Sequence, residues 1–280
     1  MRIHRYLLIG LLCLVLTTTS LQSAHANYET KSQLILKFKS LCDQHPSQTD
    51  YWSIGKTVYG NEIWMFFFGN SNGRRILLEA QVHGSEDLGS EMLYLMAKWL
   101  FTDDSDAQYI RSNCAVYLVP VMNFDSYGRK NARGVDLYYN FPTDFGGGSG
   151  YRYSDEYRGP YALSEPESRT MHNVFSNYRF RYYLSIHQGG GPYLAPYRYM
   201  SSTAVNTLKS RISQESSQRG VTPYPYDTAG DPGSEIRDAY AHGIRAWLLE
   251  ANGYPYRPDS WNIPYYYRRA LPILIAMAYA

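Results

Sequence analysis

Short apolar stretches and longer segments with helical spacing alternate along the chain. The apolar stretches are rich in branched or aromatic residues and short enough for strands; they lie at residues 63–68, 76–80, 115–121, 182–186 and 246–249. The segments between them that have helical spacing lie at 88–99, 164–177, 203–219 and 265–279. Strands that alternate with helices form a sheet buried on both faces. We therefore expect an α/β fold with three α/β/α layers and a mixed, mostly parallel central sheet.

Two segments without apolar periodicity are expected to be connections. Residues 70–73 (Asn-Ser-Asn-Gly), between the first two apolar stretches, predict a hairpin turn. The glycine-rich residues 146–150 predict a surface loop. Because no internal repeat or linker is visible, we expect residues 27–280 to form one domain.

The first 26 residues have the pattern of a secretory signal peptide. Arg2 and Arg5 precede an apolar run at 7–16, and the small-residue pattern Ala24-His25-Ala26 predicts cleavage before Asn27. The alternative is a membrane anchor, but the run is much shorter than the roughly 20 apolar residues that a spanning helix needs. The sequence thus predicts export to the periplasm or the outside, with no membrane association after cleavage.

The charge of the mature chain is balanced. Removing residues 1–26 takes away two of the 27 basic residues and none of the 25 acidic ones, which leaves 25 of each and no net charge. Such a balance gives no electrostatic reason to expect nucleic acid as a partner. We expect a monomer whose partner is a peptide substrate.

Tyrosines and cysteines add weaker signals. The 29 tyrosines cluster in the second half of the chain, and such density suits the walls of a groove for a peptide or a sugar, although ordinary packing is the alternative for any single tyrosine. Cys42 and Cys114 remain after cleavage. They are too few for a disulfide scaffold, and either a bridge or two buried thiols fits the sequence.

Three apolar stretches lead into histidine or glutamate. The stretch at 76–80 is followed by His83 and Glu86 at the start of a helix, the stretch at 182–186 by His187, and the stretch at 246–249 by Glu250. A histidine and a glutamate three positions apart are weak evidence alone, because a hydrogen-bonded loop histidine is the usual explanation. Together, the three strand ends deliver two histidines and two carboxylates to one edge of a sheet.

This set of residues suits a catalytic zinc ion. Such an ion needs three protein ligands, an open position for water, and a nearby carboxylate that takes a proton from that water. The alternative for Glu250 is a structural salt bridge. However, an acid after an apolar strand is costly to bury unless it has a partner or a task.

The chain also resembles a known family, the zinc metallocarboxypeptidases of the carboxypeptidase A type, over nearly the whole mature sequence. The matching pieces occur in the family order: His83-Gly84-Ser85-Glu86, Pro120-Val121-Met122-Asn123-Phe124-Asp125, Arg129-Lys130-Asn131, Gly134-Val135-Asp136-Leu137, Asn140-Phe141-Pro142, Ser164-Glu165-Pro166-Glu167, Ser185-Ile186-His187 and Glu250. The spacing from Arg129 to Gly134 and the Ser-Glu-Pro-Glu segment look most like the bacterial branch that trims cell-wall peptides, including the murein peptide amidases.

The resemblance implies roles for individual residues. It implies one zinc ion per chain with three ligands: His83, Glu86 and His187. Glu250 matches the glutamate that activates the attacking water, and Arg129 matches the arginine that polarises the scissile carbonyl and stabilises the oxyanion. Asp136 matches the carboxylate that orients the first histidine ligand.

One departure from the family pattern concerns the substrate. Tyr138-Tyr139 stands where the family has Asn-Arg, whose arginine grips the free carboxylate of the substrate. Two phenols cannot form the bidentate ion pair of a guanidinium. Arg237 could supply the missing charge, or it could pair with a neighbouring acid on a surface helix. The candidate substrate-binding residues are Tyr138, Tyr139, Asn140 and Arg237.

The sequence therefore predicts an exported zinc peptidase that hydrolyses peptide bonds in cell-wall stem peptides or other short peptides. One alternative is a zinc amidohydrolase or deacylase on the same scaffold. Another is a catalytically weakened protein that binds peptide or glycan, which the lost Asn-Arg pair and the tyrosines would fit. The complete ligand set and Glu250 argue against a pure binding protein.

Overall fold

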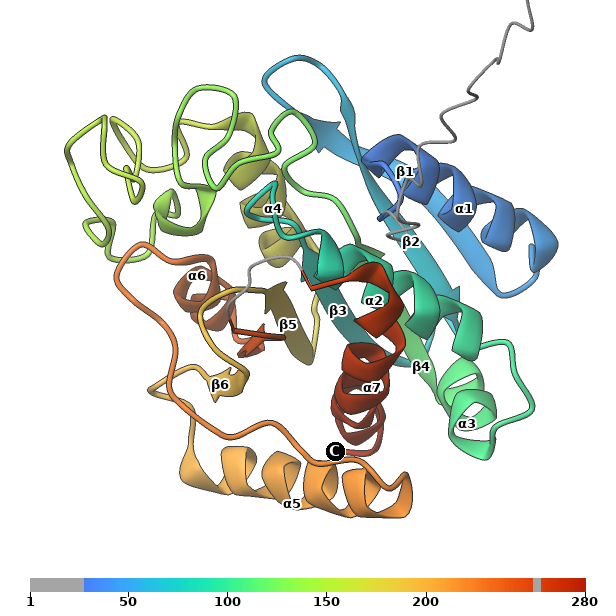
Figure 1. Cartoon of the computed structure of the whole chain (residues 1–280). Coiled ribbons are helices and arrows are strands. Elements are labelled where there is room, and N and C mark those ends of the chain that lie inside the picture. Colours follow the sequence, from blue (N-terminus) through green and yellow to red (C-terminus); the bar gives the residue numbers. More distant parts are fainter. Residues whose placement is uncertain (1–27, 254–257) are drawn as a thin grey trace, which may run out of the picture.

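The computed structural model describes residues 28–253 and 258–280. The predicted signal peptide therefore lies outside the described residues, as do Tyr254 and Tyr256. Within the described ranges, no helix is both long and apolar enough to cross a bilayer. The protein is built around one mixed sheet with helices on both faces (Figure 1).

The sheet has seven strands in the order β1-β2-β4-β3-β5-β7-β6. Their bounds are β1 Thr49–Lys56, β2 Glu62–Gly69, β3 Arg74–Ala80, β4 Cys114–Val119, β5 Tyr182–His187, β6 Tyr193–Pro196 and β7 Arg245–Glu250. The central strands β4, β3, β5 and β7 are parallel to one another, whereas β2 and β6 run antiparallel to their neighbours. Because β1 is antiparallel to β2, it runs in the common direction. The mixed, mostly parallel sheet is thus confirmed.

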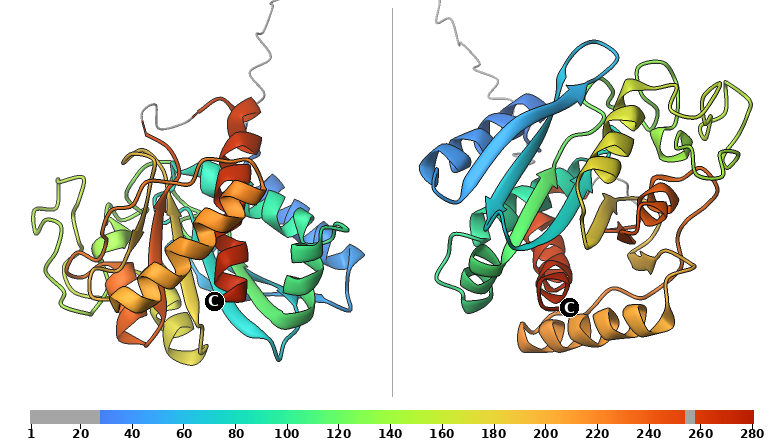
Figure 2. Two further views of the ribbon diagram at one scale, coloured as in Figure 1. Left: turned by 90° about the horizontal axis from the view of Figure 1, so that it is seen from below. Right: turned by 180° about the vertical axis from the view of Figure 1, so that it is seen from behind.

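Helices cover each face of the sheet. One face packs against α1 (Lys31–Gln44), α2 (Asp87–Trp99), α3 (Ser105–Asn113), α5 (Ser202–Gln218) and α7 (Ile263–Tyr279). The other face packs against α4 (Pro166–Asn177) and α6 (Glu235–Ala241) (Figure 2). Two short 3₁₀ helices complete the fold: η1 (Leu137–Tyr139) and η2 (Ser260–Asn262). This arrangement is the three-layer architecture expected from the alternating pattern.

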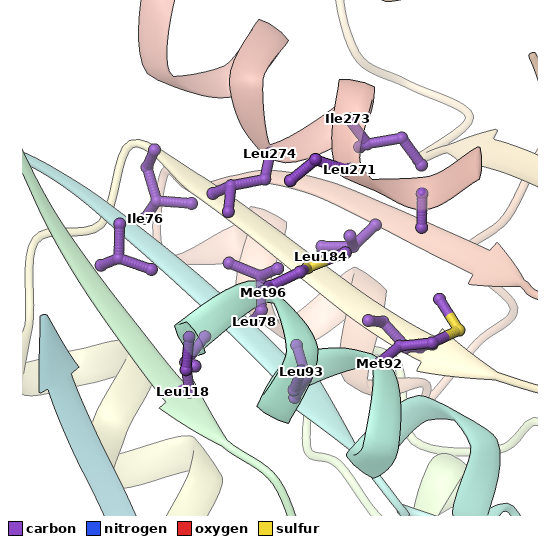
Figure 3. Packing of buried hydrophobic residues seen from close by; sticks show 14 of the residues in the cluster. Ile76, Leu78, Met92, Leu93, Met96, Leu118, Leu184, Leu271, Ile273 and Leu274 are labelled. Carbon is purple, nitrogen blue, oxygen red and sulfur yellow. The ribbon is translucent and has the colours of Figure 1, made fainter. Parts of the chain in front are cut away.

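The core follows the alternation of side chains along the strands. Ile76 and Leu78 of β3 point to the face covered by α2 and α7, while Leu77 between them belongs to the core cluster on the opposite face. Figure 3 shows Met92, Leu93 and Met96 of α2 and Leu271, Ile273 and Leu274 of α7 packed over these strands. Burial of each such side chain contributes roughly 1.5–3 kcal/mol of transfer free energy. The central strands that carry the site are therefore rigidly held.

The predicted hairpin at 70–73 is wrong. Residues 70–73 do join β2 to β3, but these strands are not neighbours, because β4 lies between them and pairs with both. A turn sequence specifies a local reversal of the chain. It cannot show that a later strand will lie between the two strands that the turn joins. The strands β1 and β6 and the helices α1 and α3 were also not predicted, since they lack a long apolar pattern.

Cys42 and Cys114 are both free thiols. Burial raises the pKa of Cys42 to about 12 and that of Cys114 to about 11. Of the two alternatives that the sequence allowed, the structure thus shows buried thiols. The glycine-rich residues 146–150 form an irregular surface segment, as expected.

Candidate active site

The carboxyl ends of three parallel strands meet at one edge of the sheet. In the register of β3 and β5, Ala80 pairs with Ile186, and in that of β5 and β7, His187 pairs with Glu250. The chain leaves β3 at this edge and reaches His83 and Glu86 before α2 begins at Asp87. The predicted convergence of strand ends is therefore present.

The turn between β3 and α2 is tightly constrained. Gln81 has a φ of 56°, a left-handed conformation that is uncommon for a residue other than glycine. Its side-chain amide donates to Asp87 at 2.5 Å, which helps to hold the turn. Gly84 lies so close to the carbonyl oxygen of Ser126 that a Cβ atom there would collide with it. This conformation directs both His83 and Glu86 toward His187.

His83, Glu86 and His187 place their donor atoms around a common point. Nδ1 of His83 lies 2.7 Å from Glu86 Oε1 and 3.4 Å from Nδ1 of His187. Nδ1 of His187 lies 3.2 Å from Glu86 Oε2. All three residues are buried, and their donor atoms all lie within 4.8 Å of one another.

These distances fit a single zinc ion. Donor atoms that share a tetrahedral zinc at about 2.0–2.1 Å lie about 3.3 Å apart, close to the 3.4 Å between the two Nδ1 atoms. Glu86 Oε2 is buried and accepts no hydrogen bond from a described residue, although it lies 3.2 Å from His187 Nδ1. A buried carboxylate oxygen that accepts no hydrogen bond is a suitable ligand for a cation.

Each histidine is held from behind by a buried carboxylate. Nε2 of His83 lies 3.0 Å from Asp136 Oδ1, and Nε2 of His187 lies 3.0 Å from Glu235 Oε1. A carboxylate at Nε2 favours the tautomer that carries its proton there, which leaves the Nδ1 lone pair for a metal. The contact expected between Asp136 and His83 is present, and Glu235 provides the equivalent contact for His187.

Further buried polar groups continue from Glu235 into the sheet. The hydroxyl of Ser185 donates to Glu235, and the hydroxyl of Tyr183 donates to Glu79 on the neighbouring strand. Glu79 is fully buried, and its burial together with the charge of Glu235 raises its pKa well above the usual range. The contact between Tyr183 and Glu79 thus lies next to the contact of Glu235 with His187.

Burial and charge act in opposite directions on the pKa values at this centre. Burial alone would lower the pKa of His83, but Glu86 and Asp136 raise it to about 9. Burial would raise the pKa of Glu86, but the two histidines lower it to about 2. Without a metal the imidazoles thus bind protons, so metal binding must release them.

Glu250 lies at the end of β7 beside His187. Its Oε2 accepts a hydrogen bond of 3.0 Å from the backbone N–H of Gly190. A Cβ atom at Gly190 would lie only 2.7 Å from Oε1, so glycine permits this close approach. Burial raises the pKa of Glu250, an effect that the nearby His187 opposes. The position of this carboxylate and its raised pKa both suit a proton acceptor.

Arg129 forms an ion pair with the buried Asp136 beside the centre. Nε of Arg129 donates to Asp136 Oδ2 at 2.8 Å, while the other oxygen of Asp136 faces His83. The Arg129 side chain is 35% exposed and lines the same pocket as Glu250. Its guanidinium thus presents a fixed positive charge to the pocket.

Aromatic side chains form much of the remaining wall of this pocket. Tyr138, Tyr139 and Tyr193 line it together with Asp231. The ring of Tyr138 packs against the imidazole of His187, with ring centroids 5.6 Å apart. The expectation that Tyr138 and Tyr139 are near the substrate site is consistent with these positions.

Asn140 and Arg237 do not reach the pocket. Asn140 is fully buried, and its side-chain amide donates to the carbonyl oxygens of Arg158 and Tyr161 and to Ser164 Oγ. Arg237 forms an ion pair with Asp144 and is not among the residues that line the pocket. In this geometry Asn140 organises a loop and Arg237 pairs with Asp144, so their role in substrate binding stays a prediction.

Several residues of the site were not assigned to it from the sequence. Glu235 was not given a role at the metal centre, yet it contacts His187. Asp231, Gln188 and Tyr193 line the pocket from segments without a recognisable motif. For these residues, the only sequence signal of a place in the pocket was that Gln188 directly follows the predicted ligand His187.

Comparisons with known proteins agree with this geometry. A family model described as zinc carboxypeptidase, of the M14 peptidases, matches residues 36–258. The chain therefore belongs to the zinc carboxypeptidase family, whose members are hydrolases that use one zinc ion. The fold agrees with this membership, so the chain is placed among the zinc carboxypeptidases.

Individual relatives are distant. The human carboxypeptidase N catalytic chain is 26% identical over 276 residues, covering 84% of this chain and 55% of that protein. Carboxypeptidase SOL1 of Arabidopsis thaliana is 27% identical over 176 residues, covering 58% of this chain and 33% of that protein. The chain thus spans only a third to just over half of these two relatives.

Solved structures share the fold. Carboxypeptidase A from Helicoverpa armigera matches with a TM-score of 0.75 and 20% identity, covering 92% of this chain and 75% of that one. Murein-tripeptide amidase from Escherichia coli O157 matches with a TM-score of 0.58 and 18% identity, covering 81% of this chain and 91% of that one. At such identities the likeness concerns the fold alone.

Proposed function

We propose that this protein is exported and hydrolyses peptide bonds in short peptides, specifically stem peptides of the bacterial cell wall. One observation carries the peptidase assignment: the donor atoms of His83, Glu86 and His187 converge in the pocket that Glu250 and Arg129 also line. This combination offers a ligand set, a proton acceptor and a fixed positive charge within one pocket.

In this proposal, each residue has a defined task. His83, Glu86 and His187 hold the zinc ion, which as a Lewis acid activates water and polarises the scissile carbonyl. Glu250 takes a proton from the attacking water and passes it to the leaving amine, while the N–H of Gly190 fixes the position of its carboxylate. Arg129 stabilises the negative charge that develops on the carbonyl oxygen.

The choice of substrate is supported by the composition of the pocket. Arg129 is the only lysine or arginine among the described residues that line it, whereas Asp231 adds a carboxylate. Phenols occupy the positions expected for the carboxylate-binding arginine, so a simple C-terminal carboxylate has no dedicated partner. Asp231 instead favours a leaving residue that carries an amine, as the diamino acids of stem peptides do.

Export and a cell-wall substrate are supported by the sequence and by the fold. The signal-type pattern of residues 1–26 favours export. The fold likeness to murein-tripeptide amidase shows that this architecture occurs in a protein of that name. The first observation supports a substrate outside the cytoplasm, and the second supports a cell-wall peptide as that substrate.

Product analysis tests the proposal. Purified mature protein would be incubated with a peptidoglycan digest, peptides with a free or amidated C-terminus, and acylated amino acids, and the products identified by mass spectrometry. We expect cleavage within stem peptides and little preference for a free over an amidated C-terminus. Glu250→Gln is the matched control for contaminating activity. Release of acyl groups alone would favour a deacylase, and binding without any product would favour a binding protein.

A further inference from the structure

We propose that His172, Asp238 and His242 bind a second divalent transition-metal ion, apart from the centre at the sheet edge. His172 lies on α4, Asp238 lies on α6, and His242 caps the carboxyl end of α6. Asp238 and His242 are four positions apart, so they project from the same side of the helix. We call these three residues the helix cluster.

The distances within the helix cluster suit one ion. Asp238 Oδ2 lies 2.7 Å from His172 Nδ1 and 3.9 Å from His242 Nε2. Ligand atoms that share a tetrahedral ion at about 2.0–2.1 Å lie about 3.3 Å apart, a value between these two distances. The three donor atoms all lie within 4.8 Å of one another, so small side-chain rotations would bring them to one ion.

The charge of Asp238 also favours a cation. Its side chain is only 1% exposed. Thr143 Oγ1 donates to Oδ1 at 2.6 Å, which leaves Oδ2 facing the two imidazoles. Among the described residues, no lysine or arginine pairs with Asp238, so its partners are a hydroxyl and two histidines. A divalent ion at Oδ2 would neutralise the charge of this buried carboxylate.

The site has room for solvent ligands. The side chains of His172 and His242 are 25% and 27% exposed. A bound ion could thus complete its coordination with water. Two imidazoles and one carboxylate favour zinc and its neighbours over calcium or magnesium, which prefer oxygen ligands.

An ion here would join α4 to α6. The helix α6 begins with Glu235, which contacts His187, so the helix cluster and the sheet-edge centre share one structural element. The ion would stabilise the packing of the two helices by mass action. It lies outside the pocket of Glu250 and Arg129 and therefore has no direct part in hydrolysis.

Zinc stoichiometry tests the proposal without reference to activity. Mature protein would be equilibrated with a small excess of Zn²⁺, passed through a desalting column and analysed for metal. We expect two zinc ions per wild-type chain and one per chain in the double variant His172→Gln/His242→Gln. Each single variant should lower the second-site affinity at least about tenfold, because two ligands hold an ion far less well than three.

Two controls separate this result from the proposed peptidase function. His45→Gln removes a histidine that stacks on Phe101, and it should leave two ions bound. His83→Ala should lose only the sheet-edge ion. One ion in wild type, or two in the double variant with its peptidase activity intact, would overturn the second site while leaving the proposed peptidase untouched.

Discussion

The protein places two histidines and one carboxylate close together in two different settings. In the sheet-edge centre, His83 and His187 are fixed by Asp136 and Glu235, and the donors lie in a pocket with Glu250. In the helix cluster, the two histidines are about a quarter exposed, and among the described residues they share a single buried carboxylate, Asp238. The ligand types are the same, but the surroundings differ.

The difference shows what turns a metal site into a catalytic one. The ligand set can hold an ion in either place, but only the sheet-edge centre adds a proton acceptor and the guanidinium of Arg129 to the same pocket. Parallel strand ends deliver these groups to one edge, whereas a helix pair offers only neighbouring surface positions. Removing the sheet-edge groups should therefore abolish chemistry, and removing the helix cluster should not.

The largest effect is expected for Glu250→Gln. The amide cannot accept the proton of the attacking water, so kcat should fall by a factor on the order of 10² to 10⁴. Zinc content should not change, since Glu250 is not one of the three proposed ligands. Steady-state kinetics on a cleaved stem peptide and metal analysis of the same preparation measure both quantities.

The helix cluster supplies the comparison for that experiment. His172→Gln should leave kcat and KM within about twofold of wild type, because the residue lies outside the pocket. If Glu250→Gln retained near-normal turnover, the base would have to be reassigned. If His172→Gln lost turnover as severely as Glu250→Gln, the functional distinction between the two regions would be wrong.

A somewhat smaller loss is expected for Arg129→Gln. Removing one preorganised group that stabilises an oxyanion typically lowers kcat by about 10² to 10³. Arg129→Lys should recover only part of this loss, since an ammonium cannot reproduce the guanidinium contact with Asp136 while facing the substrate. A loss confined to KM in both variants would show that Arg129 binds substrate without stabilising the transition state.

The sheet-edge centre could be predicted because its signals are local. His83, His187 and Glu250 each follow an apolar stretch, and parallel strands bring their ends to one edge. The same reasoning predicted the layers of the fold. The turn at 70–73 shows its limit, because the position of β4 between β2 and β3 depends on pairing between distant segments.

The other residues at the site could not be predicted, because their positions depend on contacts between segments that are distant in sequence. Glu235 contacts His187, which lies 48 positions away in the sequence. Arg237 forms an ion pair with Asp144, 93 positions away. The helix cluster joins His172 to a residue 66 positions away. Within it, only the four-residue spacing of Asp238 and His242 was visible in the sequence, and that spacing is common on ordinary helices.

Glu235→Gln should weaken zinc binding without removing a ligand. Loss of a carboxylate that orients a ligating histidine typically lowers metal affinity by about 10- to 100-fold. Competition with a chelator of known affinity measures the change for the sheet-edge zinc. Glu91→Gln is a matched control, because Glu91 is also a buried acid but accepts a hydrogen bond from the backbone of Glu29 in place of contacting a proposed ligand.

A result for Glu235→Gln that equals the Glu91→Gln control would show that Ser185 and the backbone suffice to orient His187. The two regions would then differ less than the contacts suggest. A loss of zinc together with a shift in the absorption spectrum of the Co²⁺-substituted protein would instead confirm that Glu235 controls the ligand geometry.

The smallest effect concerns the stability of the helix cluster. His242 Nε2 lies 3.9 Å from Asp238 Oδ2, too far for a hydrogen bond, and its side chain is partly exposed. In chelator-treated protein, His242→Gln should therefore change the free energy of unfolding by no more than about 0.5 kcal/mol. His172→Gln should cost more, about 1 kcal/mol, because it removes the contact of 2.7 Å to the buried Asp238.

With zinc bound, His242→Gln should become strongly destabilising, because the variant loses the stabilisation that the ion supplies. A free zinc concentration about 100 times the dissociation constant of the site stabilises the folded chain by about 2.7 kcal/mol. Thermal unfolding would be compared in the His83→Ala background, where the sheet-edge site is incomplete, so that any rise in Tm with added Zn²⁺ reports on the helix cluster. The rise should disappear on adding His242→Gln, although that substitution changes almost nothing without metal. An equal rise with and without His242 would mean that zinc stabilises the chain elsewhere, and the likeness between the two regions would end at their ligand types.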